Sequence, residues 1–175
     1  MGTFPGGNII RVTPTLETAQ YAGGDVLFAS TEIPNAVASR GGTSLIMAMQ
    51  VVDYSDNQDD QEIFYVFTEK QVNLGTTNAT ADVSAADFKA SNPIGYTFQD
   101  SNQAFTGATI DDFAINHVFT ADGTGSSSVG GQHFMIKADE GSTSVYVSGV
   151  LRATDGAPTY AADSLQLVFH LKYLD

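Results

Sequence analysis

The chain has 175 residues, of which 42% are hydrophobic and 15% charged, and its formal net charge is −13. This length and composition suit one compact domain with a core, and the acidic balance argues against a nucleic-acid partner because it repels phosphate. The sequence contains no cysteine, which excludes disulfides, thiolate nucleophiles and cysteine-ligated zinc. Without a long apolar run or a visible secretory signal, we expect no membrane among its partners.

The first residues, 1–8, are rich in Gly and Pro, which predicts a flexible N-terminal arm. The remainder, residues 9–175, has no repeat of fixed period and no linker, so we expect a single domain. Within it, Ile9–Thr13 predicts a short first strand that Pro14 ends. A brief pairing segment is expected at Asp25–Phe28.

The strongest central strand is predicted at Ser44–Tyr54, after a connection over Ser30–Gly42 that contains Pro and Gly. A helix is the competing interpretation, because Leu, Met, Ala and Gln are good helix formers. We favour a strand because the run follows Gly-Gly-Thr and ends in Val-Val-Asp-Tyr. Strict alternation would place Leu45, Met47, Met49 and Val51 on one face and Ile46, Ala48 and Val52 on the other.

A second two-sided apolar strand is predicted at Glu62–Thr68, and the two strands suggest a hairpin with a long acidic loop at Asp53–Gln61. The outer face of a sandwich sheet is usually polar, so apolar residues on both faces need a further cover. Either the long loops or another subunit would supply that cover. The residues on the apparent second faces are Ile46, Ala48, Val52, Phe64 and Val66.

The only good helix candidate is Val83–Ala90, where Ser84 is positioned to cap the helix with Asp87 three residues later. A Gly- and Ser-rich loop is expected at Ala121–Gln132. Alternating or β-prone runs predict further strands at Tyr96–Phe98, Phe105–Thr109, Phe113–Phe119 and Phe134–Ala138.

The C-terminal part, Ser144–Tyr173, organises the prediction of the fold. Its second run alternates cleanly, with Leu165, Leu167, Phe169, Leu171 and Tyr173 facing one way, and a tight hairpin turn at Asp139–Ser142 leads into the first run. Two such strands cannot hide their apolar faces alone and need a second sheet. With about eight strands in total, we predict an all-β fold, a single-domain antiparallel β-sandwich of jelly-roll-like type with one short helix.

Acidic residues offer the first candidates for chemistry. The acidic loop, with Asp53, Asp56, Asp59, Asp60 and Glu62, contains oxygen ligands of the kind calcium takes, but its spacing lacks the central Gly of the helix-loop-helix calcium motif. A solvated loop is the favoured interpretation. Paired carboxylates at Asp111–Asp112 or Asp139–Glu140 would hydrolyse a glycoside only at a defined separation across a cleft.

No other pattern indicates catalysis. His117, His133 and His170 lack a metal-ligand spacing, and we expect them at the edge of the core. Ser126–Ser128 have no neighbouring base, and neither a Gly-x-Ser-x-Gly elbow nor a phosphate-binding loop occurs. We therefore assign no catalytic, cofactor-binding or metal residues, expect no cofactor, and do not expect an enzyme.

Four stretches together resemble a family of small β-rich virion structural proteins of tailed bacteriophages, common in phages of marine bacteria. They are V-T-P-T-L-E-T-A-Q-Y-A-G-G-D-V-L-F (Val12–Phe28), I-P-N-A-V-A-S-R-G-G-T-S-L-I-M-A-M-Q-V-V-D (Ile33–Asp53), V-N-L-G-T-T-N-A-T-A-D-V-S-A-A-D (Val72–Asp87) and G-S-T-S-V-Y-V-S-G-V-L-R-A-T-D-G-A-P-T-Y (Gly141–Tyr160). The resemblance implies a capsid decoration or cement protein, made in the host cytoplasm and located on the capsid surface of the virion. Its implied partners are the major capsid protein and itself, as a homotrimer.

Two other functions remain open. A carbohydrate-binding jelly-roll module of a tail fibre or surface appendage would stack sugars on tyrosines, since the chain has no Trp. A hydrolase using the scattered acids, such as Asp111 and Asp112, is the least favoured. The candidate tyrosines are Tyr54, Tyr65, Tyr96, Tyr146 and Tyr160.

Overall fold

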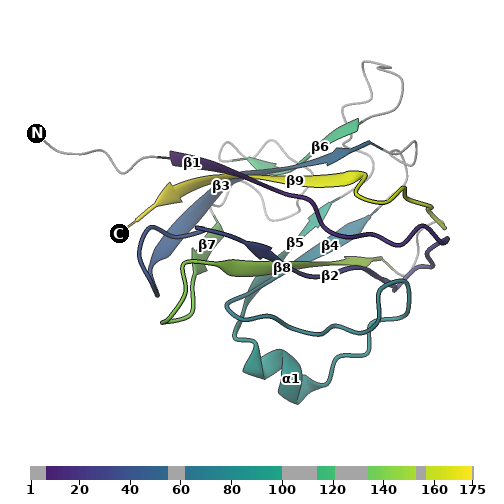
Figure 1. Ribbon diagram of the computed structural model, residues 1–175, viewed down its shortest axis with the longest axis horizontal. Helices are drawn as coiled ribbons and strands as arrows, with labels where there is room; N and C mark the ends of the chain where they lie inside the picture. The colour runs from purple at the N-terminus through teal and green to yellow at the C-terminus, as the bar shows by residue number, and fades with distance from the viewer. Residues whose placement is uncertain (1–6, 55–61, 100–113, 121–133, 153–156, 175) are drawn as a thin grey trace, which may run out of the picture.

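The computed structural model describes residues 7–54, 62–99, 114–120 (backbone only), 134–152 and 157–174. In this part of the chain, nine strands and one short helix form two packed antiparallel sheets (Figure 1). The five-stranded sheet contains β1 (Gly7–Val12), β9 (Leu165–Tyr173), β3 (Thr43–Asp53), β6 (Ala114–Thr120) and β7 (Phe134–Lys137), in the order β1-β9-β3, with β6 and β7 both paired to β3. The four-stranded sheet has the order β2 (Val26–Ile33), β8 (Val145–Leu151), β4 (Ile63–Thr68), β5 (Pro93–Gln99).

The strand pairing is that of one long hairpin wound into two layers. Strand β1 pairs with β9, β2 with β8, β3 with β6 and β7, and β4 with β5, so the first half of the chain meets the second half in reverse order. Further ladders, between β3 and β9 and between β4 and β8, close each sheet. This winding is the jelly-roll arrangement, and the predicted all-β sandwich with one short helix is confirmed.

The core lies between the sheets. Strand β9 follows the predicted alternation over most of its length: Leu165, Leu167, Phe169 and Leu171 are buried, His170 is partly exposed and Lys172 is exposed. Val168, on the opposite face, is buried as well, and Tyr173 is only partly buried. Aromatic rings join the layers, since Phe67 on β4 and Phe169 on β9 pack edge to face with centroids 6.1 Å apart. The C-terminal run thus organises the interior as expected.

On β3 the predicted faces are wrong, because a bulge interrupts the alternation. The pairing with β9 shifts between Ile46 and Ala48, so Met47 is the extra residue. As a result Ile46 and Met49 are both fully buried although they are three residues apart, and Met47 and Ala48 are only partly buried. The pattern of apolar residues carried no sign of this shift, since every residue around it is apolar.

Two predicted hairpins are also wrong. Strands β3 and β4 lie in different sheets, so they do not form a hairpin. Likewise β7 and β8 lie in different sheets, although a turn does form at Asp139–Ser142, where the Ser142 N–H donates to the Asp139 carbonyl at 2.8 Å. Long loops and tight turns look alike in sequence whether they connect neighbouring strands or opposite layers.

Several strands begin or end at other residues than the sequence predicted. Strand β2 continues to Ile33, into the segment expected to be a connection, and β5 is longer than predicted, starting at Pro93. Strand β1 starts at Gly7. Strands β6 and β7 occur where they were expected. The expected strand at Phe105–Thr109, the loop at Ala121–Gln132 and most of the N-terminal arm lie outside the described residues.

Candidate functional site

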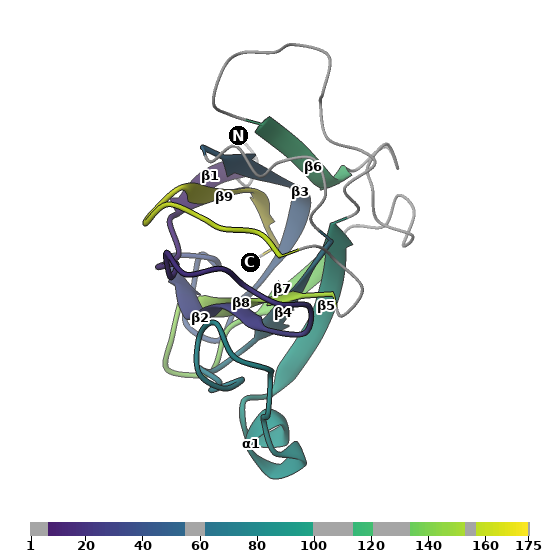
Figure 2. The ribbon, with the colours of Figure 1, turned by 90° about the vertical axis from the view of Figure 1, so that its right-hand side faces the viewer.

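A third layer covers half of the outer face of the four-stranded sheet. It consists of residues 69–92, which include the helix α1 (Ala85–Ala90), and it lies on the side of that sheet away from the five-stranded sheet (Figures 1 and 2). Ser84 caps the helix as predicted: its Oγ accepts from the Asp87 N–H at 3.1 Å. Short segments pair with β2 as well, for example through the Val26 N–H, which donates to the Ala79 carbonyl at 2.9 Å.

This layer has its own small apolar cluster. Val72 and Leu74 are buried against Val26 of β2, and Phe88 of α1 and Val150 of β8 pack against them. The cluster explains why β2 and β8 tolerate apolar residues on both faces. The loops therefore supply the second cover on this half of the sheet.

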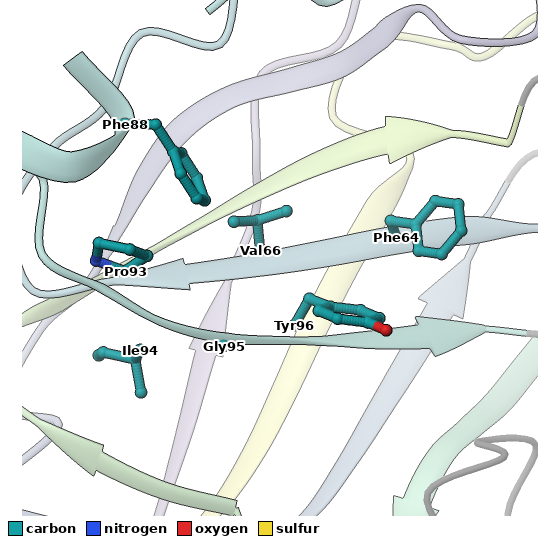
Figure 3. A pocket seen from close by; sticks show the side chains of 7 residues that line it. All are labelled: Phe64, Val66, Phe88, Pro93, Ile94, Gly95 and Tyr96. Atoms are coloured by element: carbon teal, nitrogen blue, oxygen red, sulfur yellow. The ribbon is translucent and has the colours of Figure 1, made fainter. Parts of the chain in front are cut away.

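The other half of the same face, over β4 and β5, is hollowed and open (Figure 3). The hollow has a volume of about 370 Å³. Figure 3 shows Phe64, Val66 and Tyr96 rising from the same side of the sheet, with Phe88 leaning over from α1. The full lining is Phe64, Val66, Phe88, Pro93, Ile94, Gly95 and Tyr96.

Cross-strand pairing builds the floor of this aromatic hollow. Phe64 lies opposite Phe98, and Val66 lies opposite Tyr96. The ring of Phe64 is 4.8 Å from that of Phe98 and 6.1 Å from that of Tyr96, centroid to centroid. Tyr96 is 61% exposed, the highest value among the large hydrophobic side chains described. The result is a row of packed aromatic rings whose outermost member, Tyr96, is mostly exposed to solvent.

A bulge shapes the far end of the hollow. The register of β5 against β4 shifts between Phe67 and Thr68, which leaves Ile94 as the extra residue beside Pro93. Next to it, an added Cβ at Gly95 would lie 2.8 Å from the ring of Phe134. The absence of a side chain at Gly95 therefore lets the Phe134 ring of β7 pack directly against the backbone of β5.

One charged pair, Arg152 and Glu62, lies beside the aromatic rings of the hollow. The Arg152 guanidinium lies 5.7 Å above the centre of the Phe98 ring and also forms an ion pair with Glu62. With this pair at one end and apolar side chains elsewhere, the hollow is suited to bind an apolar or aromatic group. Among the described residues that line it, none is a nucleophile placed beside a base.

The tyrosines proposed for sugar stacking are not brought together. Tyr65 and Tyr160 are buried in the core, and Tyr146 is partly buried. Tyr54 is 52% exposed at the end of β3, in the other sheet, and only Tyr96 lines the hollow. Of the expected second faces, Phe64 and Val66 do lie outside, whereas Ile46 is in the core.

The candidate acids and histidines do not form a site in the described structure. Asp53 is buried on β3, Glu62 pairs with Arg152, and Asp139 pairs with Lys70 at 3.4 Å. The backbone of His117 lies in β6, and His170 on β9 is partly exposed on the face away from the core, with its Nε2 buried. No three His, Asp or Glu side chains among the described residues are grouped to hold a metal ion. The other candidates lie outside the described residues: Asp56, Asp59, Asp60, Asp111, Asp112, Ser126–Ser128 and His133.

Sequence reasoning missed Phe88, Ile94 and Arg152 as parts of the hollow. Phe88 is the one large apolar residue in the predicted helix, and this was the available signal that the helix packs on a sheet. Nothing in the sequence indicated that Ile94 sits in a bulge or that Arg152 reaches Phe98.

No family model, curated protein or solved structure matches this chain. No helix in the described part of the chain is long and apolar enough to span a bilayer.

Proposed function

We propose that this protein is a virion structural protein of a tailed bacteriophage that decorates the capsid and stabilises it by binding neighbouring subunits through the aromatic hollow. The resemblance of four sequence stretches to such virion proteins suggests the setting. The single observation that carries the binding role is the open hollow over β4 and β5, with Tyr96 61% exposed at its edge.

The hollow has the properties of a contact point between proteins. Aromatic side chains at the centre of an interface contribute most of the binding free energy, because they bury much surface at little cost in conformational entropy. Here the rings are already held by cross-strand packing, so little order would be lost on binding. An apolar side chain from the capsid shell would fill the space between Tyr96 and Phe88.

In this proposal the partners are the major capsid protein and further copies of the chain, arranged as a homotrimer at three-fold positions of the shell. The protein acts on the capsid surface, without enzymatic activity, cofactor, nucleic acid or membrane. A two-layered sandwich without cysteine suits this role, because it folds in a reducing cytoplasm without disulfides.

Copy number tests the proposal. Quantitative mass spectrometry of particles of the virus that encodes the chain should give hundreds of copies per particle, and heads lacking the protein should bind the purified protein and withstand heat better afterwards. Absence of the protein from particles, or a dozen copies or fewer, contradicts a shell role. Light scattering of the purified protein should give three times the mass of the 18.5 kDa chain, and a stable monomer contradicts the trimer.

A second candidate is a carbohydrate-binding module, which the exposed ring of Tyr96 beside Phe64 favours, since sugars stack on such rings. A glycan array decides between them. Glycan binding that is lost in Tyr96→Ala supports the carbohydrate-binding role. If the protein binds no glycan on the array, that role is excluded.

A further inference from the structure

The outer face of the five-stranded sheet carries most of the large apolar side chains that are exposed in the described residues. Its exposed apolar side chains are Ile9 on β1, Met135 on β7 and Leu174 just after β9, which are 50%, 60% and 47% exposed. These are three of the five large hydrophobic side chains found exposed in the described residues, the others being Tyr54 and Tyr96.

Strand register places these residues around one area. Ile9 lies opposite His170, and Met135 lies opposite Leu45, which in turn lies opposite Lys172. The Leu174 N–H donates to the Thr43 carbonyl at 3.1 Å, which continues the ladder between β9 and β3. Leu45 and Met47 are partly buried between the exposed side chains. The apolar residues therefore share one face of four neighbouring strands, with His170 and Lys172 of β9 between Ile9 and Leu45.

The described strands that form this face carry charge of the opposite sign to that of the protein as a whole. Three of the seven Lys and Arg residues, Arg11, Lys137 and Lys172, belong to these strands, and each is exposed. The strands of this sheet contain one acidic residue, Asp53, which is buried. Both ion pairs found among the described residues, Lys70–Asp139 and Arg152–Glu62, lie elsewhere. In a chain of net charge −13, a basic, apolar face is a strong local contrast.

We propose that this basic apolar face, defined by Ile9, Arg11, Met135, Lys137, Lys172 and Leu174, docks onto a partner protein whose surface has an apolar centre and an acidic rim. Charge complementarity selects this partner, because opposite potentials speed encounter and exclude wrong partners. If a second copy docked on this face through a two-fold axis, the same three cations of both subunits would lie in one interface and repel one another. The inference rests on the proposed function only for the identity of the partner, the viral shell.

A defined chemical probe tests the chemistry of the face without the virus. The probe is a chromatography resin that carries aromatic carboxylates, which combine an apolar group with a negative charge. Wild-type protein should be retained at pH 7 and low salt despite its net negative charge. The double variant Arg11→Glu/Lys172→Glu should have a retention factor roughly tenfold lower, because the reversed charges repel the resin.

The matched control is Arg40→Glu/Lys89→Glu, which reverses two exposed cations outside these strands. Each double variant changes the net charge by four, from −13 to −17, so a difference between them reflects position alone. The control should keep most of the retention. A third variant, Ile9→Ser/Met135→Ser, should also weaken retention while the charge is unchanged. Unretained wild type, or equal losses in both charge variants, overturns the proposal.

Undecorated heads of the virus then identify the partner. Wild type and the Arg40→Glu/Lys89→Glu control should bind, and Arg11→Glu/Lys172→Glu should bind roughly tenfold more weakly. If wild type binds heads and all variants bind equally, this face is not the docking surface, while the decoration role stands. If the resin experiment succeeds and wild type ignores heads, the decoration role fails and the chemistry of the face stands. If light scattering reveals oligomers that Arg11→Glu/Lys172→Glu dissociates, the occupant is a second copy and the proposal is overturned.

Discussion

The ring of Phe28 on β2 occupies the space that a side chain at position 149 on β8 would need. Gly149 lies opposite Phe28 in the register of the two strands, and an added Cβ would come within 2.7 Å of Cδ1 of the ring. Phe28 in turn packs on Tyr65 of β4, with ring centroids 6.3 Å apart. One glycine therefore allows three neighbouring strands to share two large rings.

Gly149→Ala should lower the free energy of unfolding by about 1–3 kcal/mol, since a rigid buried ring must move to admit the methyl group. Denaturant unfolding followed by tyrosine fluorescence measures the change. Gly141→Ala is the control, because an added Cβ there meets no atom within 4 Å. Equal effects of the two substitutions would mean that Phe28 does not occupy this space.

The bulge in β3 makes neighbouring residues unequal. Ile46→Ala should cost about 2–5 kcal/mol of stability, as truncation of a fully buried side chain does. Met47→Ala, one residue further at the bulge, should cost about 1 kcal/mol or less because Met47 is only partly buried. Thermal unfolding of both variants checks the order. A greater loss of stability in Met47→Ala than in Ile46→Ala would contradict the bulge and support the simple alternation that the sequence suggests.

Tyr65 should make stability fall in alkali. Its hydroxyl donates to Oε1 of Gln99 at 2.7 Å, and burial is the main reason why the pKa of this phenol is raised well above its ordinary value of 10.0. The folded state therefore holds the proton where the unfolded state releases it, so the stabilisation is complete below pH 10 and is lost as the pH rises beyond it.

Tyr65→Phe should abolish this part of the pH dependence and cost about 1–3 kcal/mol at neutral pH, because the buried Gln99 amide loses its partner. Both effects are measured by the free energy of unfolding of the two proteins from pH 7 to pH 11.5. Successive measurements are about 0.5 pH units apart. If the two curves stay parallel above pH 10, Tyr65 is not the responsible group.

Tyr96 separates binding from stability. Tyr96→Ala should change the free energy of unfolding by about 1 kcal/mol or less, since most of the ring is exposed, yet weaken binding to undecorated heads roughly tenfold or more if the hollow is an interface. Tyr54→Ala is the matched control, with a tyrosine of similar exposure in the other sheet. Isothermal titration or co-sedimentation measures the affinities. Equal affinities in wild type, Tyr96→Ala and Tyr54→Ala would remove the hollow from the interface.

The sequence by itself determined the class of fold, because that depends on local periodicity. The alternation along Leu165–Tyr173 and the capped helix after Ser84 need only neighbouring residues to be visible, and both are confirmed. The two-sided apolar character of β4 was readable too, and it pointed to Phe64 and Val66 as residues on an outer face.

Only the tertiary structure decided which strands pair and where the faces break. Strands β3 and β4 are close in sequence but lie in opposite layers, because strand pairing is selected by the packing of the whole sandwich and not by loop length. The bulges at Met47 and Ile94, and the contacts of Phe88 and Arg152, depend on long-range register in the same way. The hollow and the basic apolar face exist because residues distant in the chain meet across strands, which no single segment encodes.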